Sequence, residues 1–446
     1  MADKPSQGKP MQVPSGRINR FARLSGMALG IAGNMGVGSV KELSRGSKPV
    51  FRDLLMTPGN LKRVADELAR MRGAAMKMGQ LLSMDGGQVL PQELADILAR
   101  LRDDAHFMPP KQLQSVLKDQ WGQGWIRQFE HFEVRPIAAA SIGQVHRAGL
   151  KDGREVAIKV QYPGVARSID SDVANVGTLM NMSGLIPRGF DIKPYLEEAK
   201  TQLHQETDYK REGHFLAEFG KRLSGDPAFE VPDIVPGLTT GQILTMTYVK
   251  GAPIESLTEA NQEVRNRVAT HLIDLLFREV FEFALLQSDP NFANYRFNAD
   301  TGRIVLLDFG ATREIDLGLA RGYGRLFESG VRADIDGMRK AALDVGFISD
   351  GIEPRFQDQI MAMMEMVFSS IRENPLYDFS DNALSEQMNT AGQRLAEDGF
   401  VPPPVPMDVL FMQRKFGGMF LLANRLGAQV RLRDLIEKRL QGKLAA

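Results

Sequence analysis

The segment Gln287–Gly310 sets an aspartate, an asparagine and a second aspartate around one short apolar strand, IVLL. Asp289 and Asn294 lie in the polar stretch before the strand, and Asp308 follows it directly. Phosphoryl transfer from ATP needs oxygen ligands for Mg²⁺ and a carboxylate near the incoming nucleophile. We therefore expect Asn294 and Asp308 to bind magnesium and Asp289 to act as base or to position the nucleophile. The alternative is that Asp-Pro and Asp-Phe-Gly are only turn sequences.

A lysine stands inside a second apolar strand, in the sequence EVAIKV. A charge in such a strand is costly unless a partner neutralises it, and a phosphate together with a carboxylate would do so. We therefore expect Lys159 to contact the nucleotide phosphates. An edge strand that exposes the lysine to water is the alternative.

The carboxylate partner of Lys159 is expected from the helix that contains HQETDYKREGHF. Asp208 and Glu212 are four residues apart and share a helix face, whereas Glu206 points elsewhere on an ideal helix. The spacing alone does not select among the three, and each is also compatible with an ordinary solvated helix charge.

Composition excludes several other kinds of site. The 446 residues contain no cysteine, which excludes disulfides, thiol nucleophiles and cysteine-ligated metals and fits a reducing compartment. Six scattered histidines form no His-x-x-x-His pair, so a histidine metal site is not expected. The formal net charge is zero, and no nucleic-acid partner is predicted.

The first fifty residues are basic, with eight Lys and Arg against two Asp and Glu. They include an uncharged run, Leu24–Val40, that holds five glycines and is shorter than the roughly 20 apolar residues of a membrane-spanning helix. Three interpretations stay open: a flexible tail, a surface segment anchored on anionic lipids, or a true span. The Gly26-x-x-x-Gly30 spacing hints weakly at a homodimer.

Periodicity predicts helices over residues 51–125, including one that opens after Pro109 and Pro110. Short β-branched segments follow, and Lys151-Asp152-Gly153 marks a hairpin between two of them. Residues 191–222 predict a single inserted helix, and the chain beyond Gly251 is mostly helical. We predict an α+β, bilobal architecture: a tail (1–50), a helical extension (51–125), an N-lobe (126–250) and a helical C-lobe (251–446).

An alanine-rich segment, AAASIGQV, precedes the strand of Lys159, where nucleotide-binding proteins usually carry glycines. Alanine keeps the amide donors but restricts the backbone, so the loop is expected to be stiffer and to close less readily over a γ-phosphate. Ser141 and the amides that follow it are expected to form an anion nest. The residues predicted to contact nucleotide here are Ala138, Ala139, Ala140, Ser141, Ile142, Gly143 and Val145.

Two weaker signals complete the set. In TMTYVKG, after a strand, the backbone from Met246 and Thr247 to Val249 is placed to meet an adenine edge. In MKMGQ, Lys77 and Gln80 lie one turn apart, and Gly79 allows close backbone approach. An amphipathic helix with a stray glycine is the alternative for MKMGQ.

These motifs, in this order, resemble the UbiB family of atypical kinase-like proteins, and most of all its mitochondrial coenzyme Q branch. The resemblance covers roughly residues 50–400 and rests on KMGQ, AAASIGQV, VAIK, ETDY, SDPNFAN and LLDFGATRE. The catalytic loop lacks the histidines of many bacterial members, and the chain ends in a charged segment rather than in their transmembrane helices.

The resemblance implies a protein-kinase-like fold with ATP and Mg²⁺ as cofactors, ATPase or atypical kinase activity, and a role in ubiquinone biosynthesis at a membrane. It implies that Lys77 and Gln80 fold over the cleft near the nucleotide and the acids Glu206 and Asp208, and that Glu212 pairs with Lys159. A genuine protein or small-molecule kinase and a non-catalytic nucleotide- or lipid-binding scaffold are the alternatives. Expected partners are ATP, anionic lipids and enzymes or intermediates of the quinone pathway, at a cytoplasmic location peripheral to the inner face of a membrane.

Overall fold

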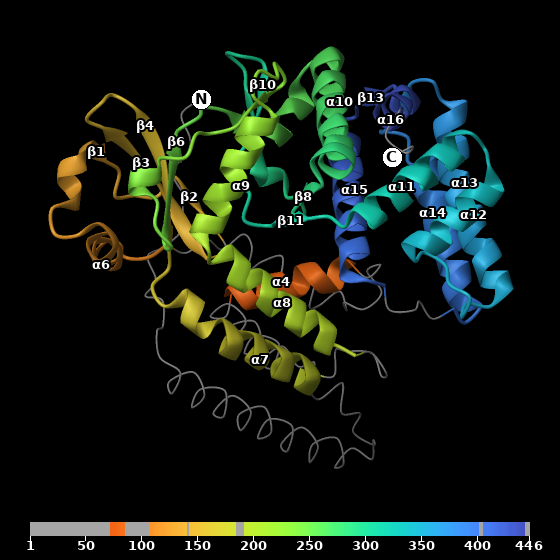
Figure 1. Cartoon of the computed structure of the whole chain (residues 1–446), viewed down its shortest axis with the longest axis horizontal. Helices are drawn as coiled ribbons and strands as arrows, with labels where there is room; N and C mark the ends of the chain where they lie inside the picture. Colours follow the sequence, from red (N-terminus) through yellow and green to blue (C-terminus); the bar gives the residue numbers. More distant parts are fainter. Residues whose placement is uncertain (1–71, 85–106, 141, 184–190, 401–404, 442–446) are drawn as a thin grey trace, which may run out of the picture. The chain divides into compact units, whose positions relative to one another are not determined.

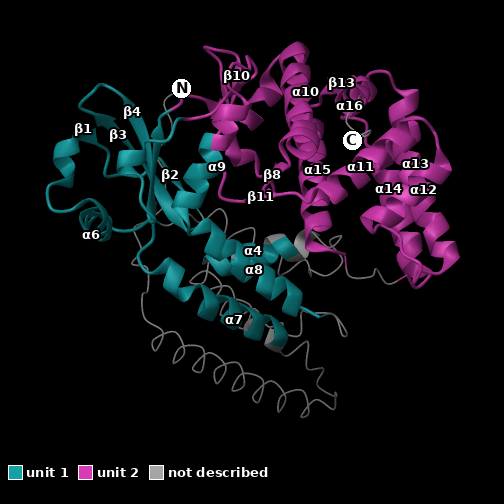
Figure 2. Ribbon diagram, in the orientation of Figure 1, with its two compact units in different colours: residues 1–217, 233–248 teal, residues 218–232, 249–446 magenta. Residues whose placement is uncertain are grey.

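The computed structural model describes residues 72–84, 107–140, 142–183, 191–400 and 405–441 (Figure 1). They belong to two compact units (Figure 2): residues up to 217 together with 233–248 form unit 1, and residues 218–232 together with those from 249 onward form unit 2. The chain passes from unit 1 to unit 2 inside helix α9 (Tyr209–Arg222). The basic tail, much of the helical extension predicted over residues 51–125, and residues 401–404 lie outside the described residues.

Unit 1 is built on an antiparallel five-stranded sheet with the order β1-β3-β4-β6, in which β2 also pairs with β3. Its strands are β1 (Phe129–Phe132), β2 (Ala138–Ala139), β3 (Gly143–Leu150), β4 (Glu155–Gln161) and β6 (Ile243–Thr247). The predicted hairpin is confirmed as β3–β4. Gly153, in its turn, has φ +85°, a value that glycine adopts without the steric cost a side chain would add.

Helices cover this sheet and extend from it. They are α4 (Arg72–Met84), α6 (Pro110–Trp121), α7 (Val165–Ser183), α8 (Lys193–Glu206) and α9, with the 3₁₀ turns η1 (Trp125–Gln128) and η2 (Pro236–Leu238). Pro110 opens α6 as predicted, and Leu113, Val116 and Leu117 of this helix join the core that Val156, Ile158 and Val160 of β4 form. Helices α4, α7 and α8 pack against one another (Figure 1).

The single inserted helix predicted for unit 1 is wrong, because α7, α8 and α9 all lie between β4 and β6. The predicted helix over 191–222 divides at Thr207 into α8 and α9. The Gln161 side chain donates to the Thr207 carbonyl at 2.6 Å, so a partner 46 residues away stabilises the break. Asp191 precedes Ile192, the N-cap of α8, and accepts from the Lys193 amide.

Unit 2 combines helices with three small sheets, of order β5-β10-β9-β7, β11-β8 and β12-β13. The strands are β5 (Phe229–Glu230), β7 (Ala252–Pro253), β8 (Leu285–Gln287), β9 (Tyr295–Asn298), β10 (Arg303–Leu306), β11 (Thr312–Glu314), β12 (Tyr377–Asp378) and β13 (Gln429–Val430). The sequence predicted only the strand of β10.

The helices of unit 2 account for most of its length, as predicted. They are α10 (Gln262–Arg278), α11 (Leu317–Val331), α12 (Ile335–Val345), α13 (Pro354–Glu373), α14 (Ala383–Glu397), α15 (Met407–Arg425) and α16 (Leu432–Leu440). Shorter turns are η3 (Ile254–Glu259), the π-helical η4 (Glu279–Phe283) and η5 (Phe292–Asn294). None of the helices in the described part of the chain combines the length and the apolarity needed to cross a membrane.

Candidate functional site

The Lys159 side chain, inside an apolar strand of unit 1, is paired with a carboxylate. Its Nζ lies 2.9 Å from Oε1 and 3.0 Å from Oε2 of Glu212, on the first turn of α9. Lys159 is 8% exposed and Glu212 1%. Glu212 is therefore the partner, as the resemblance implied, and the edge-strand alternative is wrong because β4 is paired on both sides, by β3 and β6.

The sheet register fixes which residues surround this amine. Val145 on β3 and Leu244 on β6 are the direct cross-strand partners of Lys159. The Tyr209 ring, at the start of α9, lies below the amine with 5.2 Å between Nζ and the ring centroid. Val145, predicted to contact nucleotide, thus shares a sheet face with Lys159.

The helix of MKMGQ is α4, and its lysine is also paired. Lys77, which is buried, forms an ion pair with Glu206 at the end of α8. Gln80 belongs to the same helix, but its side chain lies outside the described part of the structure. Asp208 instead caps helix α9, because its Oδ1 accepts from the backbone amides of Lys210 and Arg211.

The alanine-rich segment is a tight hairpin. Ala138 and Ala139 form β2, and the amide of Ala140 donates to the Gly143 carbonyl at 2.8 Å, so this donor is committed within the turn. Ile142 is buried in the core. Ser141 lies outside the described residues.

Gly143 lets two neighbours come close. A Cβ on this residue would collide with the Val160 carbonyl oxygen of β4 and come within 3.0 Å of the Tyr209 hydroxyl. The glycine is thus required where β3 meets β4, and close packing accounts for it in the sequence GQV.

The strand that ends in TMTYV uses most of its donors within the sheet. The amide of Thr247 donates to the Asp233 carbonyl, and that of Tyr248 donates to the Glu155 carbonyl, each at 2.8 Å. Met246 is buried and bridges to Ile234. Val249 is the first residue of the next unit 2 segment. The amides of Thr247 and Tyr248 are therefore already committed within unit 1.

A buried polar chain in unit 1 was not anticipated from the sequence. Gln144 accepts from the Met108 amide and donates to Nε2 of His146, and Nδ1 of His146 faces the Glu133 carbonyl at 2.9 Å. These contacts place the proton on Nδ1 of a neutral imidazole. Burial lowers the pKa of His146 to about 4, against a smaller opposing effect of the Glu133 carbonyl.

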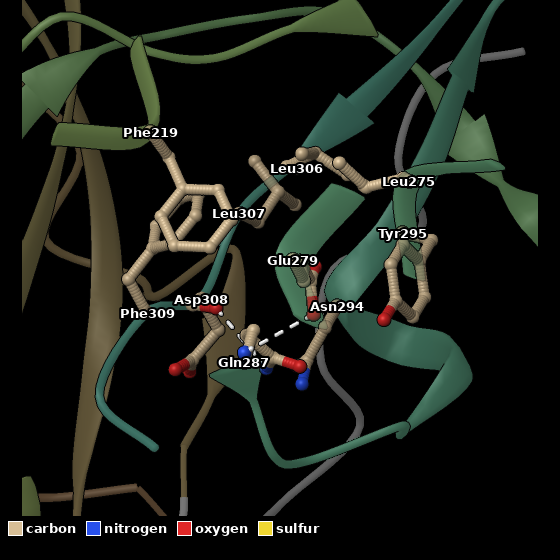
Figure 3. A pocket seen from close by; sticks show the side chains of 10 residues that line it. All are labelled: Phe219, Leu275, Glu279, Gln287, Asn294, Tyr295, Leu306, Leu307, Asp308 and Phe309. Atoms are coloured by element: carbon tan, nitrogen blue, oxygen red, sulfur yellow. Dashed lines mark hydrogen bonds between the residues drawn. The ribbon is translucent and has the colours of Figure 1, made fainter. Parts of the chain in front are cut away.

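Unit 2 brings Asp289, Asn294 and Asp308 together. Asn294 Nδ2 donates to the backbone carbonyl of Asp289 at 3.2 Å and lies 3.4 Å from the side-chain Oδ2 of Asp289. The backbone carbonyl of Asn294 accepts from the amide of Leu307, the residue before Asp308. Asp308 accepts from the Gly310 amide through Oδ1. Asn294 and Asp308 line one pocket, and Figure 3 shows their amide and carboxylate pointing to the same side of it, with Gln287 between them.

Helix α15 supplies two cations to this region that the sequence analysis missed. Arg414 Nη2 lies 2.7 Å from Oδ1 of Asp289. The next residue, Lys415, is buried and contacts the Tyr295 hydroxyl at 2.9 Å, Gln287 Oε1 at 3.2 Å and Glu279 at 3.4 Å. Two adjacent cations inside the apolar run VLFMQRKFGGMFLL were the signal that could have revealed them.

Charge in the Lys415 cluster is set by burial and by mutual attraction. Burial raises the pKa of Glu279 and of Tyr295, although the Lys415 ammonium opposes both shifts. Burial alone would lower the pKa of Lys415, but Glu279 and Tyr295 outweigh it and keep that pKa above its ordinary value. The amine thus remains protonated.

The profile of the ABC1 atypical kinase-like domain matches residues 100–342, from before α6 into α12. The chain belongs to the ABC1 family of atypical kinase-like proteins, as the predicted UbiB resemblance required. The mitochondrial atypical kinase COQ8 of Saccharomyces cerevisiae is 35% identical over 434 residues, which cover 96% of this chain and 86% of the yeast protein. The mitochondrial atypical kinase COQ8B of Rattus norvegicus is 33% identical, over 97% and 82% of the two chains.

Solved structures carry the same fold. The Rv3197–erythromycin complex from Mycobacterium tuberculosis superposes with a TM-score of 0.63 at 24% identity, over 85% of this chain and 95% of that one. The predicted α+β, kinase-like fold class of this ABC1 protein is confirmed. Helices α13 to α16, and with them Arg414 and Lys415, lie beyond the residues that the domain profile matches.

Proposed function

We propose that the protein binds ATP with Mg²⁺, hydrolyses it or transfers its γ-phosphoryl group, and in this way supports ubiquinone biosynthesis. The observation that carries the proposal is the grouping of Asp289, Asn294 and Asp308 in unit 2. The kinase-like family and the mitochondrial COQ8 relatives support the same activity and pathway.

The donor set fits magnesium. Mg²⁺ is usually held by one or two protein oxygen ligands together with phosphate oxygens and water. The side chains proposed as protein ligands are Asn294 and Asp308, which line one pocket. Because Asn294 Nδ2 faces Asp289, its Oδ1 turns away from that residue. Bound Mg²⁺–ATP would supply the phosphoryl group and neutralise its charge.

We assign separate roles in this reaction to Lys159, Asp289 and the alanine-rich loop. Lys159, oriented by both oxygens of Glu212, would contact the phosphates. Asp289 would orient the attacking hydroxyl or water, while Arg414 contacts its Oδ1. The Ala138–Ala139 strand and the committed amide of Ala140 support a phosphate loop that closes less than a glycine loop, which favours water over a bulky acceptor.

We further propose peripheral attachment to the inner face of a membrane, through anionic lipids and the basic residues 1–50, and contact there with quinone-pathway enzymes or intermediates. The excess of basic residues in that segment supports the lipid contact. A homodimer through the glycine-spaced run is the corresponding assembly. The predicted division into four sequence regions likewise stays a proposal.

The test is ATP turnover by the purified protein, with and without anionic liposomes, for the wild type, Asp308→Asn and the control Asp300→Asn. Asp300 is an exposed turn residue between β9 and β10. We expect turnover to need Mg²⁺ and Asp308 and to rise with liposomes. Equal turnover by all three proteins would reject the proposal. Phosphate found on a protein or small molecule in an Asp289-dependent way would indicate a genuine kinase, and quinone synthesis sustained by Asp308→Asn would indicate a scaffold.

A further inference from the structure

Helix α15 contacts the segment Gln287–Pro290 at three successive points. Arg414 pairs with Asp289, and Lys415 contacts Gln287. One turn further along the helix, a Cβ on Gly418 would overlap the Cβ and Cγ atoms of Pro290. The helix therefore lies against the residues on both sides of the Asp289 backbone.

Lys415 is connected to the backbone of Asp308, the second proposed magnesium ligand, through the side chain of Gln287. Its Nζ lies 3.2 Å from Gln287 Oε1, and Gln287 Nε2 donates to the Asp308 carbonyl at 3.2 Å. The backbone amide of Gln287 donates to Oε2 of Glu279, the ion-pair partner of Lys415. Figure 3 shows Gln287 bonded in this way to both Asp308 and Glu279. The position of the Asp308 backbone thus depends on a side chain that Lys415 orients.

We propose that α15 is a positioning element for phosphoryl transfer, in which Gly418 sets the approach of Pro290 and Lys415 orients Gln287. This inference rests on the function proposed above. Gly418 and Lys415 act through Pro290 and Gln287, so they are positioning residues. A displacement of about 1 Å at a reacting group can cost on the order of 100-fold in rate.

Simple core packing is the competing explanation, and it would change stability alone. Gly417 provides a matched control for Gly418, because both are in α15 and a Cβ on Gly417 would meet nothing within 4 Å. Alanine at either position favours the helix equally, but only the one at 418 displaces Pro290. The two variants therefore differ chiefly in the Asp289 loop.

The first experiment measures kcat and KM for ATP in Gly417→Ala and Gly418→Ala, with the melting temperature of each. We expect Gly417→Ala to turn over within about twofold of the wild type. We expect Gly418→Ala to lose roughly tenfold or more in kcat, with KM for ATP changed much less, because the loop acts on transfer rather than on nucleotide binding. Equal kcat in the two variants would overturn the role of Gly418.

The second experiment separates the stability role of Lys415 from its positioning role. Lys415→Met is compared with the double variant Lys415→Met/Glu279→Gln, which removes both charges of the pair and keeps an acceptor for the Gln287 amide. We expect the double variant to recover most of the melting temperature while its kcat stays at least tenfold below that of the wild type. Recovery of kcat together with the melting temperature would overturn the positioning role of Lys415.

The wild type and Asp308→Asn are assayed in the same series. Wild-type turnover that does not depend on Asp308 would reject the proposed function, and this inference with it. Asp308-dependent turnover with equal rates in the two glycine variants and a fully recovered double variant would reject only the inference about α15.

Discussion

Among the described residues, each unit contains a lysine–glutamate pair in which both partners are buried, Lys159–Glu212 in unit 1 and Lys415–Glu279 in unit 2, and these two pairs differ in their surroundings. In unit 1, both oxygens of Glu212 lie 2.9–3.0 Å from Lys159, whose side chain keeps 10% of its surface exposed. In unit 2, Glu279 is 3.4 Å from Lys415, whose side chain is 2% exposed and also contacts Tyr295 and Gln287. The Lys159 side chain thus keeps slightly more of its surface exposed than the Lys415 side chain, although both lysines are buried.

The difference teaches that a buried charge pair is not by itself a sign of a ligand site. Desolvation offsets much of the attraction in a buried pair, so the presence of the pair is weak evidence of net stabilisation. Lys159 is proposed to contact a phosphate, and Lys415 is proposed to position the backbone that carries the proposed magnesium ligands. The following predictions test that contrast.

The largest effect is expected when one partner of the enclosed pair is removed. Lys415→Met leaves Glu279 buried without its cation and is expected to lower the free energy of unfolding by about 3–5 kcal/mol. Lys159→Met is expected to cost about 1–3 kcal/mol, because Lys159 retains more solvent access. Urea unfolding of both variants measures this, and equal losses would break the contrast.

The next effect is a pH dependence that arises in unit 1 from the buried, neutral imidazole of His146. Its pKa in the folded protein is about 4, below the ordinary 6.5, so protons bind the unfolded chain more tightly. The stability it contributes is complete above pH 6.5 and is lost as the pH falls toward 4, by about 3 kcal/mol in total. Urea unfolding between pH 7 and 4.5 measures this loss. His146→Gln should lose less stability over that range, and parallel curves would contradict the assignment.

A catalytic effect of comparable size is expected at the Lys159–Glu212 pair. Removing one electrostatic contact to a transferring group costs on the order of 100-fold in rate, about 2.7 kcal/mol in activation free energy. Lys159→Met is therefore expected to lose roughly that much ATP turnover while it stays folded by circular dichroism. A folded Lys159→Met protein with wild-type turnover would assign Lys159 a purely structural role.

The smallest effect concerns the helix that carries Lys415. Gly417 is an exposed helix residue with open space around it, so Gly417→Ala is expected to stabilise the protein by about 0.5–1 kcal/mol. Thermal or urea unfolding gives the value. A loss of stability would mean that α15 is constrained at this face as well, and that Gly417 cannot serve as the control for Gly418.

Local signals predicted part of this structure well. Lys151-Asp152-Gly153 fixed the β3–β4 hairpin, and Pro110 marked the start of α6. The break at Thr207 escaped because the residues around it favour a helix, and Gln161, which stabilises the break, belongs to a distant strand. Glu206, which was expected to point away from the face of Asp208 and Glu212, pairs with Lys77, and Glu212 pairs with Lys159.

In the candidate site, too, local sequence motifs predicted some residues, and contacts between distant segments determined the others. Asp289, Asn294 and Asp308 belong to short sequence motifs, so the sequence alone was enough to single them out as candidates. The partners of Lys415 come from three separate segments, at Glu279, Gln287 and Tyr295, and helical periodicity treats such a position only as core. Tertiary contacts of this kind become visible only in the folded structure.

The most direct test of the central claim is calorimetric titration of ATP into the wild type and Asp308→Asn, each with and without Mg²⁺. If Asn294 and Asp308 hold the metal beside the phosphates, Mg²⁺ will tighten ATP binding to the wild type, and Asp308→Asn will lose most of that gain while binding metal-free ATP as before. The same Mg²⁺-dependent gain in both proteins, or no ATP binding by either, would contradict the account.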